Sequence, residues 1–185
     1  MIPVRSTALP GCIELHPPVH RDERGSFAKP FHASTFEALG LAAEWKELFY
    51  SVSERGALRG LHFQAPPADH AKLVCCLAGE IFDVVLDLRL GSPTYRQFET
   101  FHLPTWAALF VPSGLAHGFV ALTDGAVVAY AVTTEHDPAC DAGIRWDSVP
   151  GIPWPNATPT VSARDAAFPA LDDFVTPFIY EAAHV

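Results

Sequence analysis

Short runs of apolar residues, cut by turns, fill the middle of the chain from residue 45 to about 134. Runs of this length and spacing, with Gly or Pro between them, are typical of an all-β sandwich or barrel. The 17 prolines and 12 glycines argue against long helices. The pattern predicts strands at Glu47–Ser53, Leu58–Gln64, Leu73–Leu77, Ile81–Arg89, Gln97–Leu103, Ala107–Val111, Gly118–Leu122 and Ala126–Thr134.

The flanking segments are less regular. Residues 1–21 predict one or two short strands, and Ser26–Phe31 predicts another. Ser34 as N-cap and Gly40 as a stop predict a short helix between them. Residues 135–160 are irregular, and residues 162–185 predict one short helix. We expect a single domain over 1–185, with a core at about 45–134 and the C-terminal segment packed on the barrel.

The composition is that of a globular chain, with 49% hydrophobic and 18% charged residues. A net charge of −9 argues against a nucleic-acid partner or an anionic membrane surface, but leaves room for a small anionic ligand. No apolar run is long enough for a membrane span. The N-terminus lacks the pattern of a secretory signal, and the four cysteines show no CxxC spacing, so we expect a cytoplasmic protein with free thiols.

Three basic side chains lie close together around one predicted strand, at Arg59, His62 and Lys72. Alternation puts Gly60, His62 and Gln64 on one face, and in a small barrel a polar inner face lines a cavity. A lone strand histidine is more often structural, but the two neighbouring cations favour a site. Arg59 falls on the opposite face from His62, which requires either a bulge at Gly60 or a side chain that reaches around an edge.

Three other candidates each have two interpretations. Lys72 either extends from a strand end to water or stabilises a developing oxyanion or enolate in a dry pocket. Tyr130 is either core packing or a general acid facing the cavity. Asp165 is either an ordinary acid at a helix start or, if the chain folds back, a carboxylate that orients His62.

Pro112-Ser113-Gly114-Leu115-Ala116-His117 resembles the second motif of cupins. A cupin metal centre also needs an HxH and a downstream Glu, whereas the matching stretch here, His62-Phe63-Gln64, supplies one histidine. The ligand set is incomplete, so we expect a cupin-like barrel without a metal.

Several motifs together resemble the nucleotide-sugar 3,5-epimerases typified by dTDP-4-dehydrorhamnose 3,5-epimerase. Their order and spacing make the resemblance specific, and it covers nearly the whole chain. The motifs are Asp22-x-Arg24-Gly25-x-Phe27, Gly56 to Gln64, Ala71-Lys72-Leu73-Val74, Gly79 to Arg89, Gly91-Ser92-Pro93-Thr94, Pro112 to Phe119, Gly143 to Asp147 and Ser162-x-Arg164-Asp165.

The resemblance implies a cupin-type jelly roll with short peripheral helices, a homodimer with the N-terminal strands at its interface, and no cofactor. It implies a nucleoside-diphosphate 4-keto-6-deoxyhexose as substrate, whose ketone acidifies the hydrogens at C3 and C5. His62 would be the base, oriented by Asp165. Tyr130 would be the opposing acid, and Lys72 would hold the enolate oxygen.

The same resemblance implies the substrate contacts. Arg59, Arg24 and Arg164 would pair with the diphosphate and nucleotide, and His117 would lie near the sugar. The remaining predicted contacts are Gln64, Asp141, His136, Lys29, Glu47 and Phe49.

The chain departs from the family pattern at five positions, of which Lys29, Glu47 and Phe49 fall where the family contacts the nucleotide. Lys29 replaces a Glu, Glu47 and Phe49 fall in place of QxNxS, Ala131 replaces a Lys, and His136 replaces a later aromatic residue. The base therefore stays open among thymidine, cytidine, guanosine and uridine. Three alternatives also stay open: a mono-epimerase, a metal-dependent cupin, and a non-catalytic sugar-nucleotide-binding barrel.

Overall fold

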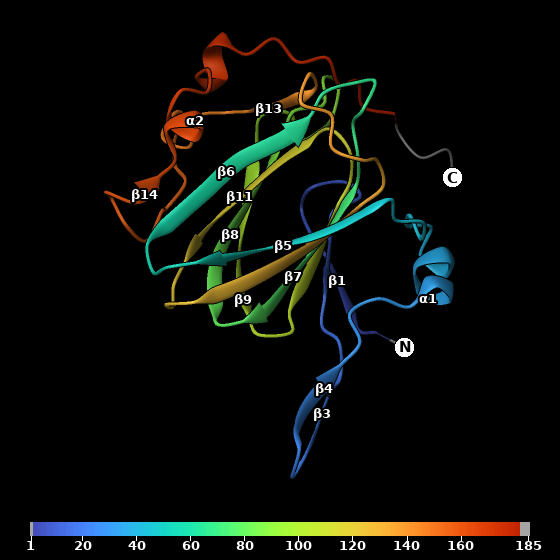
Figure 1. The fold of residues 1–185 in the computed structure, drawn as a ribbon. Coiled ribbons are helices and arrows are strands. Elements are labelled where there is room, and N and C mark those ends of the chain that lie inside the picture. Colours follow the sequence, from blue (N-terminus) through green and yellow to red (C-terminus); the bar gives the residue numbers. More distant parts are fainter. Residues whose placement is uncertain (1, 182–185) are drawn as a thin grey trace.

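A computed structural model of the chain describes residues 2–181 and consists mainly of two sheets packed face to face (Figure 1). The first sheet has the order β1 (Val4–Ser6), β2 (Ile13–Leu15), β10 (Ala108–Val111), β7 (Lys72–Ala78), β12 (Ala126–Val132) and β5 (Glu47–Ser53). The second has the order β13 (Asp141–Gly143), β6 (Ala57–Gln64), β11 (Leu115–Ala121), β8 (Glu80–Asp87) and β9 (Phe98–Pro104), with β14 (Thr160–Val161) also pairing with β6. This architecture is a jelly roll, and it confirms the predicted all-β fold class.

Apolar side chains from both sheets meet between them. Val74, Leu109 and Val128 of the first sheet pack against Val85 and Phe119 of the second, and all five are buried. Burial of such side chains is the dominant favourable contribution to folding. It also explains why the strands from residue 47 to 132 were predictable from their apolar pattern.

Each sheet is covered on its outer face by chain from outside the central strands. The C-terminal segment covers the second sheet, where Ile144 and Leu171 join the buried cluster around Leu86. The N-terminal segment covers the first sheet through α1 (Ala33–Ala38), whose Phe36 is buried against Trp45.

Two local predictions were wrong. The N-cap of α1 is His32 rather than Ser34, and it makes no side-chain capping bond; Ser34 lies in the first turn and pairs through its hydroxyl with His32 Nδ1. Packing of Phe36 fixes where this short helix begins, and the capping pattern does not. The strand predicted at Gly118–Leu122 begins three residues earlier, directly after the turn at Gly114, so that His117 is the third residue of β11 (Leu115–Ala121).

The segment predicted as irregular contains β13, a strand of three residues that extends the second sheet beside β6. The C-terminal region holds α2 (Ala163–Ala166) and a 3-10 turn at Leu171–Asp173. Among the described residues, no helix is long and apolar enough to cross a bilayer.

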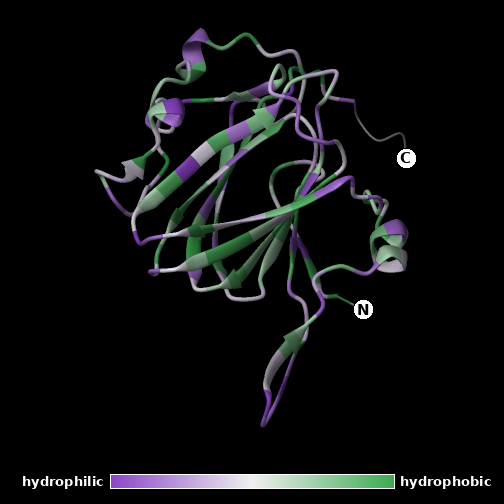
Figure 2. Cartoon of the chain, viewed as in Figure 1, coloured by the Kyte–Doolittle hydropathy of each residue, from purple (hydrophilic) through white to green (hydrophobic). Residues whose placement is uncertain are grey.

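One hairpin stands away from the barrel (Figure 1). It consists of β3 (Val19–Asp22) and β4 (Gly25–Ala28), which pair only with each other. By contrast, β6 runs across the barrel with polar, purple positions interspersed among its apolar ones (Figure 2). This mixture marks the strand that carries the site.

Candidate active site

A bulge in β6 brings Arg59 and His62 to the same side. His62 pairs with His117 of β11, whereas Arg59 pairs with Phe119, so three steps along β6 match two along β11. The bulge depends on Gly60, which has φ +136°, and a Cβ built there would lie 2.5 Å from Gly118 Cα. Of the two expected solutions for Arg59, the bulge is the one the chain uses.

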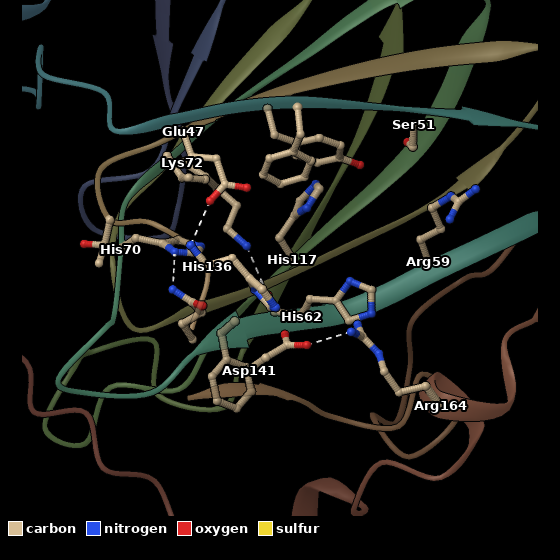
Figure 3. A pocket seen from close by; sticks show the side chains of 16 residues that line it. Glu47, Ser51, Arg59, His62, His70, Lys72, His117, His136, Asp141 and Arg164 are labelled. Atoms are coloured by element: carbon tan, nitrogen blue, oxygen red, sulfur yellow. Dashed lines mark hydrogen bonds and ion pairs between the residues drawn. The ribbon is translucent and has the colours of Figure 1, made fainter. Parts of the chain in front are cut away.

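A cavity of about 410 Å³ opens between the sheets, with β6 and β11 on one wall and β5, β7 and β12 on the other. In Figure 3, Lys72, His117 and His62 converge on its middle, and Arg59 and Arg164 lie to the right of the view. Predicted site residues supply most of the lining: Glu47, Phe49, Arg59, His62, Gln64, Lys72, His117, Tyr130, His136, Asp141 and Arg164.

His62 is bonded to a carboxylate from the far end of the sequence. Asp165 Oδ2 lies 2.9 Å from His62 Nε2 and also accepts from the Gly60 backbone N–H at 3.0 Å. The C-terminal segment therefore folds back as the orienting role of Asp165 requires. Because the carboxylate accepts a hydrogen bond from the Nε2–H group, the neutral ring keeps its lone pair on Nδ1.

The two partners shift each other's pKa. Burial lowers the pKa of His62, the hydrogen bond and charge of Asp165 oppose this, and the net pKa is below the ordinary value. Burial tends to raise the pKa of Asp165, but the bonds from His62 and Gly60 outweigh it and hold that pKa well below the usual range. At neutral pH the pair is thus a neutral imidazole on a carboxylate, which is the form a general base needs.

Lys72 is a buried cation at the first position of β7. Its Nζ donates to the carbonyl of His62 at 3.3 Å, and burial lowers the pKa of its ammonium group to about 8. Within the described part of the chain, no carboxylate lies within ion-pair distance of Nζ. The ammonium is therefore available for an anion that enters the cavity.

Tyr130 lies on β12 of the first sheet, on the wall of the cavity opposite His62. Its ring stacks on that of Phe49, with centroids 4.8 Å apart and 16° between the planes. Burial raises the pKa of the phenol above its ordinary value, so Tyr130 is protonated at neutral pH. A base on β6 and a proton donor on β12 thus occupy opposite walls of one cavity.

Sequence reasoning missed Asp83, which lies behind His117. Its Oδ2 is 2.7 Å from His117 Nε2, and the carboxylate is fully buried in β8. The available signal was an acid inside the apolar run Ile81–Leu86, because a buried carboxylate needs a partner. His70 was also missed; it lines the cavity, accepts from Gln64 Nε2 at 3.1 Å, and has its pKa lowered to about 3, chiefly by burial.

The mouth of the cavity is held by polar contacts between segments. Glu47 accepts from the backbone N–H of His136 at 2.7 Å, and Arg164 Nη1 donates to Asp141 at 2.6 Å. Arg59 donates from Nε to Ser53 at 2.9 Å. The two arginines are therefore held close to where an anion would enter.

Two predicted contacts do not reach the cavity of their own chain. Arg24 lies on the turn of the projecting hairpin and pairs with Asp22 at 2.5 Å, in full exposure. Lys29 lines a separate hollow with His20 and Phe27. The reason is topological, since the hairpin strands pair with no strand of the barrel.

The described residues bring no cupin-like set of metal ligands together. His62 and His117 each have Nε2 committed to a carboxylate. Over residues 2–181, no three His, Cys, Asp or Glu side chains converge as a metal ion requires.

Fold and cavity together define a jelly-roll protein with facing acid and base groups. A family model described as dTDP-4-dehydrorhamnose 3,5-epimerase matches residues 6–173. A curated protein of that name from Salmonella typhimurium is 41% identical over 177 residues, which cover 93% of this chain and 97% of the relative. The chain therefore belongs to the dTDP-4-dehydrorhamnose 3,5-epimerase family, a family of isomerases, as its motifs predicted.

Solved structures agree. A dTDP-6-deoxy-D-glucose-3,5-epimerase from Legionella pneumophila, in complex with dTDP-4-keto-L-rhamnose, has a TM-score of 0.92 at 33% identity and covers 98% of this chain and 100% of that one. A 3'-monoepimerase from Streptomyces bikiniensis, in complex with dTDP-quinovose, has a TM-score of 0.84 at 32% identity, with 90% and 86% covered. This chain is thus similar both to enzymes named for two centres and to one named for a single centre.

Proposed function

We propose that this protein is a cofactor-independent epimerase that inverts C3, C5 or both in a nucleoside-diphosphate 4-keto-6-deoxyhexose. The ketone at C4 makes the neighbouring C–H bonds acidic, so the reaction needs a base, a partner for the enolate oxygen, and an acid on the other face of the ring. The observation that carries the proposal is the arrangement of His62 with Asp165 opposite Tyr130, with Lys72 on the same wall as Tyr130 and donating to the carbonyl of His62.

The reaction moves one proton in each of two steps. In the first, His62 Nδ1 removes a proton from C3 or C5, and Asp165 stabilises the imidazolium that forms. The electron pair moves to the C4 oxygen, where the Lys72 ammonium holds the enolate. Tyr130 then delivers a proton to the opposite face of the same carbon, the ketone re-forms, and the configuration is inverted.

Local charge supports binding of an anion by a chain of net charge −9. Arg59 and Arg164 line one part of the cavity and suit a diphosphate, because a guanidinium meets phosphate oxygens with two parallel hydrogen bonds. His117 would lie near the sugar. Gln64, Asp141, His136, Glu47 and Phe49 would surround the rest of the substrate.

The relatives are named for dTDP sugars, which makes thymidine the first base to test. Glu47 and Phe49 stand where the family pattern differs, so UDP, GDP and CDP belong in the same binding screen. The 4-keto-6-deoxy sugar of the best-bound nucleotide is then incubated with enzyme in D2O. Deuterium at C3, C5 or both is the expected result, and no exchange with any of the four nucleotides would refute the epimerase.

A metal-dependent reaction has its own test. The purified protein should retain exchange after dialysis against a chelator. Elemental analysis that finds stoichiometric iron, manganese or zinc, together with loss of exchange on its removal, would favour a metal-dependent cupin instead.

The proposal includes a homodimer in which the hairpin completes the neighbouring site. Arg24 is exposed and remote from its own cavity, and Phe27 beside it is 60% exposed on a strand without a barrel neighbour. A mixture of the Arg24→Ala and His62→Asn proteins, each impaired alone, should regain activity when subunits exchange, because one cavity then has both groups. A monomer in light scattering, or no recovery in the mixture, would argue against it. A cytoplasmic location and a role in deoxysugar biosynthesis belong to the same proposal.

A further inference from the structure

Tyr130 is held on both sides by its own sheet. Across three neighbouring strands, Phe49 of β5 pairs with Tyr130 of β12, and Tyr130 pairs with Val74 of β7. Residues directly opposite one another in adjacent strands project from the same face of a sheet. The phenol therefore stands in a row between the ring of Phe49 and the buried side chain of Val74.

The facing sheet supplies a third contact. The ring of His117 approaches that of Tyr130 edge-on, at 6.1 Å and 69°. His117 is in turn fixed by Asp83 at 2.7 Å, and both side chains are buried. Tyr130 thus has buried neighbours in Val74 and His117, whereas Phe49, which is 43% exposed, is the most exposed of these three neighbours.

The position of the Tyr130 phenol matters because the sugar ring of the substrate has two acidic carbons, C3 and C5. C3 and C5 lie on either side of the ketone, so a proton donor fixed at one point cannot reach both equally from one bound pose. Protons are delivered efficiently only within hydrogen-bond reach of the acceptor atom. The wall that fixes the phenol therefore decides which carbon is reprotonated.

We infer that Phe49 is a positioning residue that sets, through its stack on Tyr130, the proportion of inversion at C3 and at C5. This inference rests on the proposed function and deepens it. Phe49 stands in place of a polar residue in the family pattern, so the stack is a property of this chain's own sequence.

The experiment compares Phe49→Leu, which removes the ring but keeps an apolar side chain, with Phe49→Tyr, which keeps the stack. The readout is the ratio of product inverted at C3 to product inverted at C5, followed by NMR with the 4-keto-6-deoxy sugar nucleotide. Leu48→Ala serves as the control, because Leu48 is the next residue of β5, points to the outer face and is 76% exposed.

In Phe49→Leu the ratio should change by about two- to tenfold, the range that one aromatic pair is worth. An enzyme that inverts one centre should gain measurable inversion at the other. Phe49→Tyr and Leu48→Ala should keep the wild-type ratio. If Phe49→Leu fails to fold, Phe49→Met provides the same loss of the ring.

A ratio that stays constant in Phe49→Leu, whatever happens to KM or rate, would overturn the inference and leave Phe49 as a substrate contact only. A changed ratio in Phe49→Tyr would overturn it as well. The two levels of failure are distinct: absence of exchange in the wild-type protein refutes the proposed function, whereas exchange with an unaltered ratio refutes only the role of Phe49.

Discussion

Replacing Asp165 by Asn tests the core of the mechanism with a nearly isosteric change. The carboxylate of Asp165 is buried and accepts from His62 at 2.9 Å, from the Gly60 backbone at 3.0 Å and from Arg164 Nε at 3.2 Å. Asn keeps one side-chain oxygen that can accept from His62 and Gly60 but carries no negative charge. The substitution therefore isolates what the charge contributes to His62 as a base.

The magnitude follows from the hydrogen bond that changes. A hydrogen bond to a charged group contributes about 1.5–3 kcal/mol, compared with about 0.5–1.5 kcal/mol for a neutral one. The difference, about 1–2 kcal/mol, stabilises the imidazolium that forms as His62 takes the proton. Since 1.36 kcal/mol corresponds to a factor of ten in rate, Asp165→Asn should slow exchange in D2O by about five- to thirtyfold.

The direction in which the pH–rate profile shifts distinguishes a loss of charge from a loss of packing. The charge of Asp165 raises the pKa of His62 against the larger effect of burial. Without that charge the pKa of His62 falls further, so the acidic limb of the rate profile should move to lower pH while the plateau drops. The assay is initial deuterium incorporation across a pH series, with saturating substrate.

Ser162→Ala is the matched control. Ser162 Oγ caps α2 by accepting from the backbone N–H of Asp165 at 3.1 Å, so its loss should cost about 1 kcal/mol of stability without altering the charge beside His62. Its acidic limb should stay at the wild-type pH.

Stability gives a second check on Asp165→Asn. Because the pKa of Asp165 is depressed in the folded state, the stability it contributes is present above its unfolded pKa of about 3.9 and is lost as pH falls through the folded value. The difference in unfolding free energy between wild type and Asp165→Asn should therefore shrink below about pH 4. An acidic limb that stays in place or moves upward in Asp165→Asn would refute the assigned role.

Three further perturbations address other parts of the site. Because burial lowers the pKa of Lys72 to about 8, the rate should fall as pH rises through that value. Lys72→Met should remove this basic limb of the rate profile together with most of the activity. A basic limb that persists in Lys72→Met would show that another group titrates there. Gly60→Ala should destabilise the fold by about 3 kcal/mol or more in urea titrations. Gly125→Ala should cost about 1 kcal/mol, because Gly125 has φ +66° but open space around it. Equal losses of unfolding free energy in the two variants would show that the close approach of Gly60 to Gly118 does not matter. Arg24→Ala should raise KM about tenfold or more, and the increase should depend on salt concentration. Arg21→Ala, on the same hairpin, should leave KM unchanged. Equal KM values for the two variants would show that Arg24 does not bind substrate.

Sequence patterns predicted the barrel because its strands bury their apolar side chains between two sheets. The central strands lie within two residues of their predicted bounds except β11, which begins three residues early, and Gln64, His62 and Lys72 reach the cavity as strand geometry requires. The distant partners Tyr130 and Asp165 came from the resemblance to a family, since no local pattern relates residues 62 and 165. Their meeting in one site is a property of the whole fold.

Other features had no local signal. The bulge at Gly60 arises from the close approach of Gly118 on a neighbouring strand, so the face of Arg59 could not be read from β6 alone. The strand β13 has only three residues and exists because the edge of β6 accepts it. Phe49 was predicted as a substrate contact from the family resemblance, but the stack on Tyr130 depends on the register between β5 and β12.

The two histidines of the cavity show why similar pairs need not have similar roles. His62 and His117 lie directly opposite each other on β6 and β11, and each bonds a carboxylate through Nε2. Their access to water differs, since the side chain of His62 is 28% exposed and that of His117 is 4% exposed. A base that inverts a centre keeps the substrate's proton, while the acid has given one up, so each turnover ends with both groups in the wrong state. The greater exposure of His62 favours the role proposed for it as the base, because a base must return its proton to solvent before the next turnover, whereas His117 is buried against Asp83.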